Sequence, residues 1–444
     1  MKPLASALVA LCLSCPVQAA PDSGFDGGRG PQAPQAQSAP AANAQGRSTG
    51  GGDTRQWVIV DAVDTEARSK VADAGVSIEE ITPERVGGIA TAGAVERLKK
   101  LGIPFTAQDL AQRFHVEDFP VEDAAFHDYA RMTAELNKLA ASAPGLASVF
   151  SIGKSLQGRD LFALRLNTSA QGTDASDKPG ILFLGTHHAR EHLSTEVPLL
   201  LAKHLIDNRD TPEIKALLAG RDVYIVPMVN PDGVEYDITG GQYHMHRKNM
   251  RPSADGDMGV DLNRNYGFHW AEGGASDNPG DETYHGPSAF SEPETQAVKA
   301  FIESRGNLKV LLSYHTYSEL ILYPWGYTHD PMDDSRAHAA YETMAGTMAK
   351  MTGYTPEQSS KLYIASGDTT DWAWGAHKIF SFTFELTPKS MWGGGFYPGA
   401  GAIASTAAAN IRPALYLIDL ADDPYRAAAP TIGANKAARN IGGR

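Results

Sequence analysis

Two hydrophobic patterns divide the chain at about residue 120. Between residues 54 and 107, short β-rich runs alternate with two amphipathic segments in the order βαββαβ. We place strands at 57–60, 76–81, 88–91 and 103–106, and helices at 65–74 and 94–101. This order is typical of a small ferredoxin-like α+β unit.

Beyond residue 120, strands alternate with longer helical segments to about residue 420. We predict a helix at 126–141 and strands at 147–152, 162–167, 181–185, 223–229, 308–313 and 379–384. Such alternation is typical of an α/β fold. We therefore predict a mixed, twisted sheet with helices on both faces.

The two ends of the chain lack these patterns. Residues 1–20 combine one lysine, an apolar stretch and a small-residue cleavage site, which predicts a secretory signal peptide and an exported protein, secreted or periplasmic. Residues 21–53 are rich in Pro, Ala, Gln, Gly and Ser and indicate a disordered linker. We expect a small unit at 54–110, a large domain at 120–423 and a flexible tail at 424–444.

Composition narrows the function. The formal net charge of −13 argues against a nucleic-acid partner, and no later segment is long and apolar enough to span a membrane. Both cysteines, Cys12 and Cys15, lie in the predicted signal peptide. Cys15 as a lipid-anchor residue is an alternative, although the residues before it match poorly. A metal site in the mature protein must use histidine and carboxylate ligands.

Polar residues follow the apolar runs of the predicted sheet. His188 and Glu191 come after the run at 181–185, His315 after 308–313, and Glu385 after 379–384. Ligands of such sheets bind beyond the carboxyl ends of the strands. His188 and Glu191 share one face of a helical turn and, with His315, make a His₂Glu set suited to catalytic zinc. Glu385 is the candidate general base.

The same stretch allows two other interpretations. His188-Ala-Arg-Glu191-His192 matches an inverted zinc motif, in which both histidines bind metal and Glu191 is the base. It also matches a polar loop without chemistry. The inverted motif leaves the segments DLNRN, YHTYS and FTFEL without a role.

Seven segments carry a resemblance to a known family: SIGKSLQGRDL, GTHHARE, VNPDG, DLNRNYGFHW, SYHTYSELILYPWG, YIASGDTTDW and FSFTFEL. Over about residues 120–420 the chain resembles zinc carboxypeptidases of the carboxypeptidase A type, most closely the bacterial carboxypeptidase T branch. The resemblance implies a secreted peptidase that removes C-terminal residues from peptides. It implies one Zn²⁺ per chain on His188, Glu191 and His315, with Glu385 as general base.

The resemblance also implies substrate-binding residues. Asn263 and Arg264 match the pair that holds the terminal carboxylate, Tyr363 the tyrosine that covers the last residue, and Arg190 an arginine further along the cleft. We also assign Tyr317 to the substrate-binding residues. The transition-state arginine is shifted in Arg247-Lys248-Asn249-Met250-Arg251, because methionine stands at the expected place. We assign that catalytic role to Arg251, with Arg247 as the alternative.

The resemblance also leads to expectations about substrate selectivity and regulation. Thr370 stands where relatives carry an apolar residue or an aspartate, and Asp368 is suited to a basic head group, so hydrophobic and basic C-terminal residues are both expected. The alternative is that Asp368 only caps a turn. The unit at 54–110 is expected to be a prosegment, removed near Arg113 by an activating protease.

Further expectations are a monomer and peptide or protein C-termini as partners. Calcium binding at acidic residues such as 330–334 is left open. Two alternative functions are a peptidoglycan hydrolase of the same fold, cleaving γ-glutamyl–diaminopimelate links, and a catalytically silent peptide-binding protein.

Overall fold

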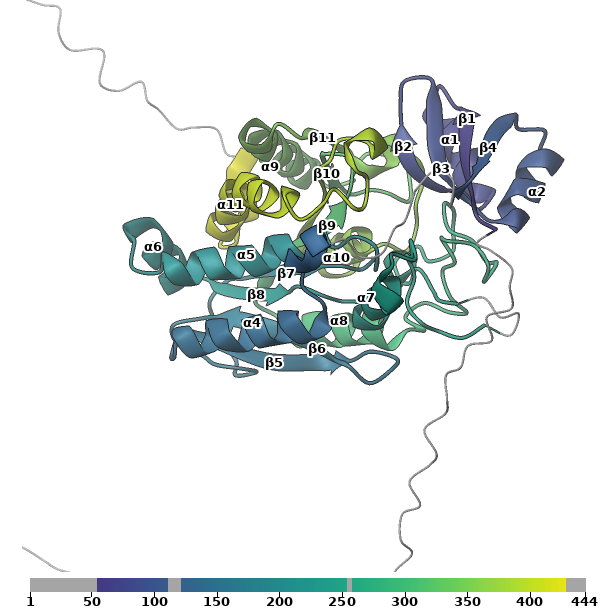
Figure 1. Ribbon diagram of the computed structural model, residues 1–444. Coiled ribbons are helices and arrows are strands. Elements are labelled where there is room, and N and C mark those ends of the chain that lie inside the picture. The colour runs from purple at the N-terminus through teal and green to yellow at the C-terminus, as the bar shows by residue number, and fades with distance from the viewer. Residues whose placement is uncertain (1–53, 111–120, 254–257, 429–444) are drawn as a thin grey trace, which may run out of the picture. The chain divides into compact units, whose positions relative to one another are not determined.

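The computed structural model describes residues 54–110, 121–253 and 258–428, which belong to one compact unit (Figure 1). The predicted signal peptide, linker, cleavage region around Arg113 and the chain beyond residue 428 lie outside the described residues. The first five residues of the predicted tail form a 3₁₀ helix, Pro424–Ala428. No helix within the described ranges is long and apolar enough to cross a membrane.

Residues 56–109 form a four-stranded antiparallel sheet with two helices, in the order that the sequence predicts. Its elements are β1 (Gln56–Asp61), α1 (Thr65–Asp73), β2 (Ser77–Ile81), β3 (Arg85–Ala90), α2 (Ala92–Lys100) and β4 (Phe105–Asp109). The strand order is β2-β3-β1-β4. Asp64 and Thr91 cap the two helices by accepting hydrogen bonds from Ala67 N and Ala94 N. We call residues 54–110 the N-terminal unit.

The larger sheet has eight strands: β5 (Ala147–Lys154), β6 (Asp160–Leu166), β7 (Gly180–Gly185), β8 (Asp222–Val226), β9 (Leu308–Thr316), β10 (Leu320–Tyr323), β11 (Thr355–Gln358) and β12 (Phe380–Leu386). Their order is β11-β10-β12-β9-β7-β8-β6-β5. The central strands β12, β9, β7 and β8 are parallel, whereas β10 pairs antiparallel with β12, and β6 with both β5 and β8. The predicted mixed sheet is confirmed.

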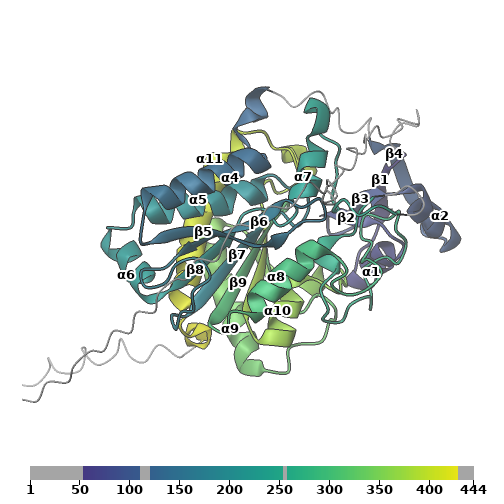
Figure 2. The ribbon, with the colours of Figure 1, turned by 90° about the horizontal axis from the view of Figure 1, so that it is seen from below.

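Helices cover both faces of this sheet (Figure 2). One face carries α4 (Tyr129–Ser142), α5 (Leu193–Asp207), α9 (Ser335–Thr352) and α11 (Ala402–Leu420), and the other α8 (Pro293–Glu303) and α10 (Thr369–His377). Two shorter helices, α6 (Pro212–Gly220) and α7 (Pro231–Asp237), flank β8 in the chain. Alternate residues of β7 enter different cores: Phe183 packs with the first set of helices and Leu182 with the second. This explains the continuous apolar run in the sequence.

Two of the strands that exceed their predicted bounds bear on the site. β9 continues to Thr316 and β12 to Leu386, so His315 and Glu385 lie within strands rather than after them, as register partners of each other. Their neighbours Tyr314 and Phe384 point into the first core. The alternation of a strand therefore places the two polar side chains on the opposite face, where an apolar partner is not required.

Candidate active site

Three buried side chains meet at the carboxyl ends of β7 and β9. His188 and Glu191 lie in the turn between β7 and α5, and His315 lies near the end of β9. His188 Nδ1 is 2.7 Å from Glu191 Oε1, and His315 Nδ1 is 3.0 Å from Glu191 Oε2. The two Nδ1 atoms are 3.1 Å apart. One potential ligand atom from each residue lies within 4.8 Å of the others, close enough for the three residues to hold one metal ion.

Neighbouring groups fix the orientation of these ligands. His188 Nε2 donates to Asp261 Oδ1 at 3.0 Å, and His315 Nε2 lies 3.1 Å from Ser313 Oγ. The backbone N–H of Thr316 donates to Glu191 Oε2 at 3.1 Å. Because the outer ring nitrogens are engaged, the Nδ1 atom of each histidine faces the Glu191 carboxylate and is left to act as a metal ligand. The donor set fits zinc.

The electrostatics of the group also suit a metal. Burial alone would raise the pKa of Glu191, but the charges and hydrogen bonds of His188 and His315 outweigh it and lower that pKa. Burial lowers the pKa of His315. A charged carboxylate and a neutral imidazole are the forms that bind metal.

The adjacent histidines are engaged elsewhere. His187 Nε2 lies 2.9 Å from the Tyr266 hydroxyl and 3.1 Å from Thr369 Oγ1. His192 Nε2 lies 2.9 Å from Asp237 Oδ2. The structure thus brings His188 and Glu191 together with His315, and it leaves out His192, which the inverted zinc motif requires.

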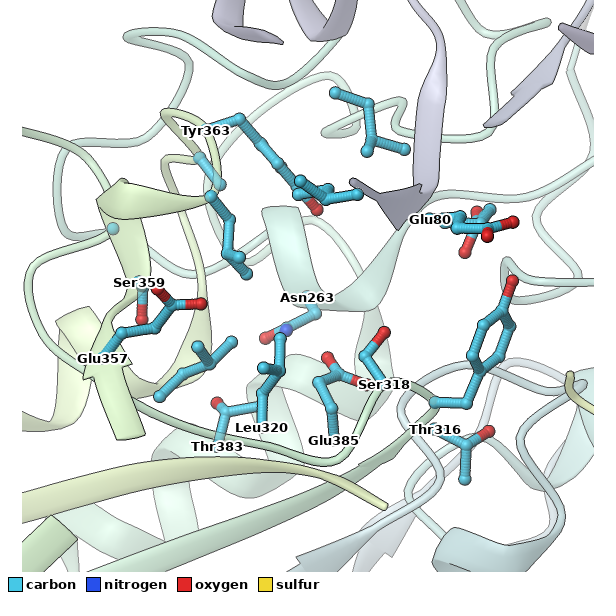
Figure 3. Close-up of a pocket in the computed structure, with 18 of the residues that line it drawn as sticks. Glu80, Asn263, Thr316, Ser318, Leu320, Glu357, Ser359, Tyr363, Thr383 and Glu385 are labelled. Carbon is cyan, nitrogen blue, oxygen red and sulfur yellow. The ribbon is translucent and has the colours of Figure 1, made fainter. Parts of the chain in front are cut away.

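The metal-ligand group borders a cavity of about 640 Å³, part of which Figure 3 shows. The predicted site residues that line it are His188, Glu191, Asn263, Arg264, Tyr317, Tyr363, Asp368, Thr370 and Glu385. Glu385 points into the cavity, and burial together with the nearby charge of Glu191 raises its pKa. The N-terminal unit lines the same cavity with Arg68 and with residues 78–83.

The two candidate arginines of the RKNMR run lie in different places. Arg247 lines the cavity, where its guanidinium binds Asp261 Oδ2 at 3.0 Å and lies 4.0 Å from Glu191 Oε1. The structure does not bring Arg251 into the cavity. Its Nε donates to Glu292 Oε1 at 2.6 Å and its Nη2 to the Ser291 carbonyl at 2.9 Å. A fully buried carboxylate distant in sequence therefore decides where Arg251 points.

The predicted carboxylate-binding pair sits at a short 3₁₀ helix, Leu262–Arg264. Arg264 donates from Nε to the Gly274 carbonyl at 3.1 Å and from Nη1 to the Asn263 carbonyl at 2.8 Å. Asn263 Oδ1 accepts from Thr369 N at 3.0 Å. Tyr363 packs against the apolar core of the N-terminal unit, and burial raises its pKa.

Arg190, predicted to contact substrate further along the cleft, is fully buried and does not line the cavity. Its Nη2 donates to Glu79 Oε1 of the N-terminal unit at 2.7 Å, and its Nη1 to Glu282 Oε2 at 2.8 Å. Its guanidinium also stacks over the Phe396 ring at 4.3 Å. Glu79 of the N-terminal unit therefore occupies one end of the Arg190 guanidinium, and Glu282 the other.

Asp368 and Thr370 stand at the start of α10. Asp368 Oδ1 accepts from Thr370 N at 2.8 Å, from Thr370 Oγ1 at 2.6 Å and from Asp371 N at 2.9 Å. Asp368 thus caps the helix while lining the cavity. Tyr317 also lines the cavity, is buried, and packs edge-on against Phe396.

Sequence reasoning missed the residues that orient the ligands and those that reach the cavity from other elements. Asp261 and Ser313 are the first residues of the recognised motifs DLNRNYGFHW and SYHTYSELILYPWG, so their positions carried a signal. The positions of Glu79 and Glu357 carried no such signal in the sequence. They belong to strands whose partners are set only by folding.

Comparison with known proteins finds zinc carboxypeptidases. A family model for zinc carboxypeptidases, peptidase M14, matches residues 132–412. A zinc carboxypeptidase of Saccharothrix mutabilis subsp. capreolus is 36% identical over 378 residues, 79% of this chain and 85% of the relative. Carboxypeptidase B of Astacus astacus is 34% identical over 279 residues, 61% of this chain and 88% of the relative.

Solved structures share the fold. The structure of carboxypeptidase A from Helicoverpa armigera has a TM-score of 0.69 at 24% identity, covering 85% of this chain and 98% of that one. Thrombin-activatable fibrinolysis inhibitor has a TM-score of 0.66 at 22% identity, covering 83% and 100%. The family match, the relatives and the His₂Glu group together lead to one conclusion: this chain belongs to the zinc carboxypeptidase family and is a metallocarboxypeptidase, a peptide hydrolase.

Proposed function

We propose that the protein releases single C-terminal residues from peptides, at one Zn²⁺ held by His188, Glu191 and His315. The observation that carries this proposal is the register of β9 and β12, which sets Glu385 beside His315 and points it into the same cavity. A three-ligand His₂Glu site and a separate carboxylate base are the parts that metal-assisted peptide hydrolysis needs.

Zinc at this site would polarise the scissile carbonyl and lower the pKa of a bound water to about 7. Glu385 would accept a proton from the attacking water and deliver it to the leaving amine. Of the two candidate arginines, Arg247 lies at the end of the cavity that contains the metal-ligand group. We therefore assign the stabilisation of the developing oxyanion to Arg247 in preference to Arg251.

Recognition of a chain end follows from the cationic side of the cavity. Arg264 lines it beside Asn263, and a guanidinium offers a planar fork suited to a terminal carboxylate. Tyr363 also lines the cavity (Figure 3), where it would cover the bound residue. A requirement for the free carboxylate restricts cleavage to the last peptide bond.

The proposed selectivity is mixed, for hydrophobic and basic C-terminal residues. Leu320 and Leu322 give the cavity an apolar surface, and Asp368 and Thr370 add polar groups. The hydrogen bonds that Asp368 Oδ1 accepts support its alternative role as a helix cap. Its second carboxylate oxygen takes no part in these hydrogen bonds and is one of the groups suited to a cation.

The N-terminal unit is proposed to be an inhibitory prosegment of an exported zymogen. Supporting this, residues 78–83 border the substrate cavity, and Glu79 binds Arg190. Further contacts hold the unit in place: Thr91 Oγ1 donates to Asp281 Oδ1 at 2.9 Å, and Arg55 binds Glu282 at 3.1 Å. The intact chain should be inactive until a trypsin-like protease cuts near Arg113, and full activity before cleavage would refute this.

One peptide, prepared as a free acid and as a C-terminal amide, tests the proposed function. The zinc-loaded protein, treated with a trypsin-like protease, is incubated with each form, with and without a chelator, and products are followed by mass spectrometry. Stepwise loss of single residues from the free acid alone, abolished by the chelator, is expected. Internal cuts in both forms would overturn the proposal.

A further inference from the structure

We propose that Glu357, on β11, is a specificity-determining residue that binds the cationic head group of a C-terminal lysine or arginine. The inference rests on the proposed carboxypeptidase function and assigns the basic half of its selectivity to one carboxylate. Glu357 lies outside every motif on which the resemblance depends, and it enters the cavity through strand pairing alone.

The floor of the cavity consists of two rows across three strands. Leu320 of β10 is the register partner of Thr355 on β11 and of Glu385 on β12. Leu322 pairs in the same way with Glu357 and Thr383. All six side chains line the cavity, as expected for register partners, which share one face of a sheet. Glu385 and Glu357 therefore occupy diagonal corners of one continuous floor.

The spacing of the two corners suits a long side chain. Two strand separations and a two-residue step place the Cα atoms of Glu385 and Glu357 on the order of 12 Å apart. Figure 3 shows both carboxylates directed into the cavity, with Leu320 and Thr383 between them. A residue whose peptide bond lies at Glu385 would extend its side chain along the leucines, and a terminal ammonium or guanidinium would arrive near Glu357.

The Glu357 carboxylate is suited to receive that charge. The residue is half-buried, and within the described parts of the chain its carboxylate has no recorded hydrogen bond or ion pair. Burial raises its pKa, and the charges of Lys361 and Arg68 act in the opposite direction. A carboxylate that is partly removed from water without a close partner gains more from an incoming cation than a solvated one does.

Two other acids of this region accept backbone hydrogen bonds, Asp368 through one oxygen and Asp371 through both. Asp368 accepts three hydrogen bonds through one oxygen as the cap of α10. Asp371 accepts from Gly326 N and Tyr327 N, and it does not line the cavity. Glu357 is thus the carboxylate at this end of the cavity with both oxygens available.

The N-terminal unit supplies a cation at the same place. Arg68 of α1 lines the cavity and donates to the Lys361 carbonyl at 3.4 Å, and its charge acts on Glu357. We infer that Arg68 provides, in the intact chain, part of the positive charge that a basic substrate side chain provides after the N-terminal unit leaves. Lys361, which is exposed, is the remaining cation near Glu357 once the unit has been removed.

The test compares peptides that differ only in a C-terminal Phe, Arg, Lys or Glu. The zinc-loaded chain is assayed before and after limited treatment with a trypsin-like protease, as wild type, Glu357→Gln and Glu357→Lys. Glu342→Gln, on α9 and outside the cavity, is the charge-matched control. Zinc content and melting temperature verify that each variant is folded and loaded.

Glu357→Gln should lower kcat/KM for Arg and Lys by about tenfold or more, since hydrogen bonds to charged groups are worth about 1.5–3 kcal/mol. The value for Phe should stay within about twofold, because no charge is involved. Glu357→Lys should raise kcat/KM for Glu, and Glu342→Gln should change no ratio. An unchanged Arg:Phe ratio in Glu357→Gln would overturn the inference alone. A wild type that releases none of the four residues would instead refute the proposed function.

Discussion

The two ends of the cavity are built differently. At the reaction end, every ligand side chain has an outer partner: Asp261 for His188, Ser313 for His315, and the Thr316 N–H for Glu191. At the opposite end, the floor is formed by side chains of three strands, and the Glu357 carboxylate has no recorded partner among the described residues. Both ends lie on one sheet face.

The difference matches the demands of each end. Ligands of a catalytic metal must keep one geometry, and outer hydrogen bonds maintain it. A surface that accepts several kinds of side chain needs apolar area and an available charge rather than a fixed network. Substitutions at the first end should therefore affect all substrates equally, whereas substitutions at the second should affect only some.

The largest effect is expected from removal of a ligand. His315→Gln should lose bound zinc and all activity, whatever the C-terminal residue, because two protein ligands do not retain the ion in a catalytic site. His192→Gln is the matched control, since His192 binds Asp237 and should leave the zinc content unchanged. Atomic absorption on the purified variants measures their zinc content. Zinc lost from His192→Gln but retained by His315→Gln would revive the inverted-motif interpretation.

The second-largest effect on activity is expected from Glu385→Gln. We expect kcat to fall by about 10²–10⁴-fold, the range for loss of a general base, by the same factor for Phe and Arg substrates. Zinc content should be normal, because Glu385 is not part of the ligand group. Steady-state kinetics on both substrates measure this. A loss confined to one substrate would place Glu385 in selectivity rather than in catalysis.

The two arginines of the RKNMR run give the next contrast. Arg247→Lys should lower kcat by about 10²–10³-fold, as for loss of an oxyanion donor, with little change in KM. Arg251→Lys should change kcat by less than about threefold, because its partner Glu292 lies outside the cavity. The reverse order would restore Arg251 to the catalytic role predicted from the sequence.

The smallest expected effect is a pH dependence of selectivity. Burial raises the pKa of Glu357, with Lys361 and Arg68 opposing it. Below its pKa the carboxyl is neutral and no longer attracts a cation. The Arg:Phe ratio of kcat/KM should therefore have its highest value at high pH. It should fall as the pH drops, beginning above the value of about 4.3 that is typical of a solvated glutamate. The ratio cancels effects common to both substrates, and in Glu357→Gln it should be flat.

Much of the fold was predictable because it is local. Apolar runs in β7 and β8 marked buried strands, and the order of elements in the N-terminal unit was correct. The spacing of His188 and Glu191 brought two ligands onto one turn. The predicted strands ended before His315 and Glu385, although both residues lie within strands. The reason is that a polar residue at the end of an apolar run does not reveal which face of the sheet it occupies.

The sequence by itself therefore determined the fold class and predicted a His₂Glu group supplied from strand ends, since each depends on neighbours a few residues apart. Tertiary structure alone decided three features. Glu292 holds Arg251 away from the cavity and leaves Arg247 there, Glu79 binds Arg190, and the pairing of β10 with β11 places Glu357 opposite Glu385. Each depends on a partner far away in the chain, and a charged side chain takes the partner that folding brings within reach.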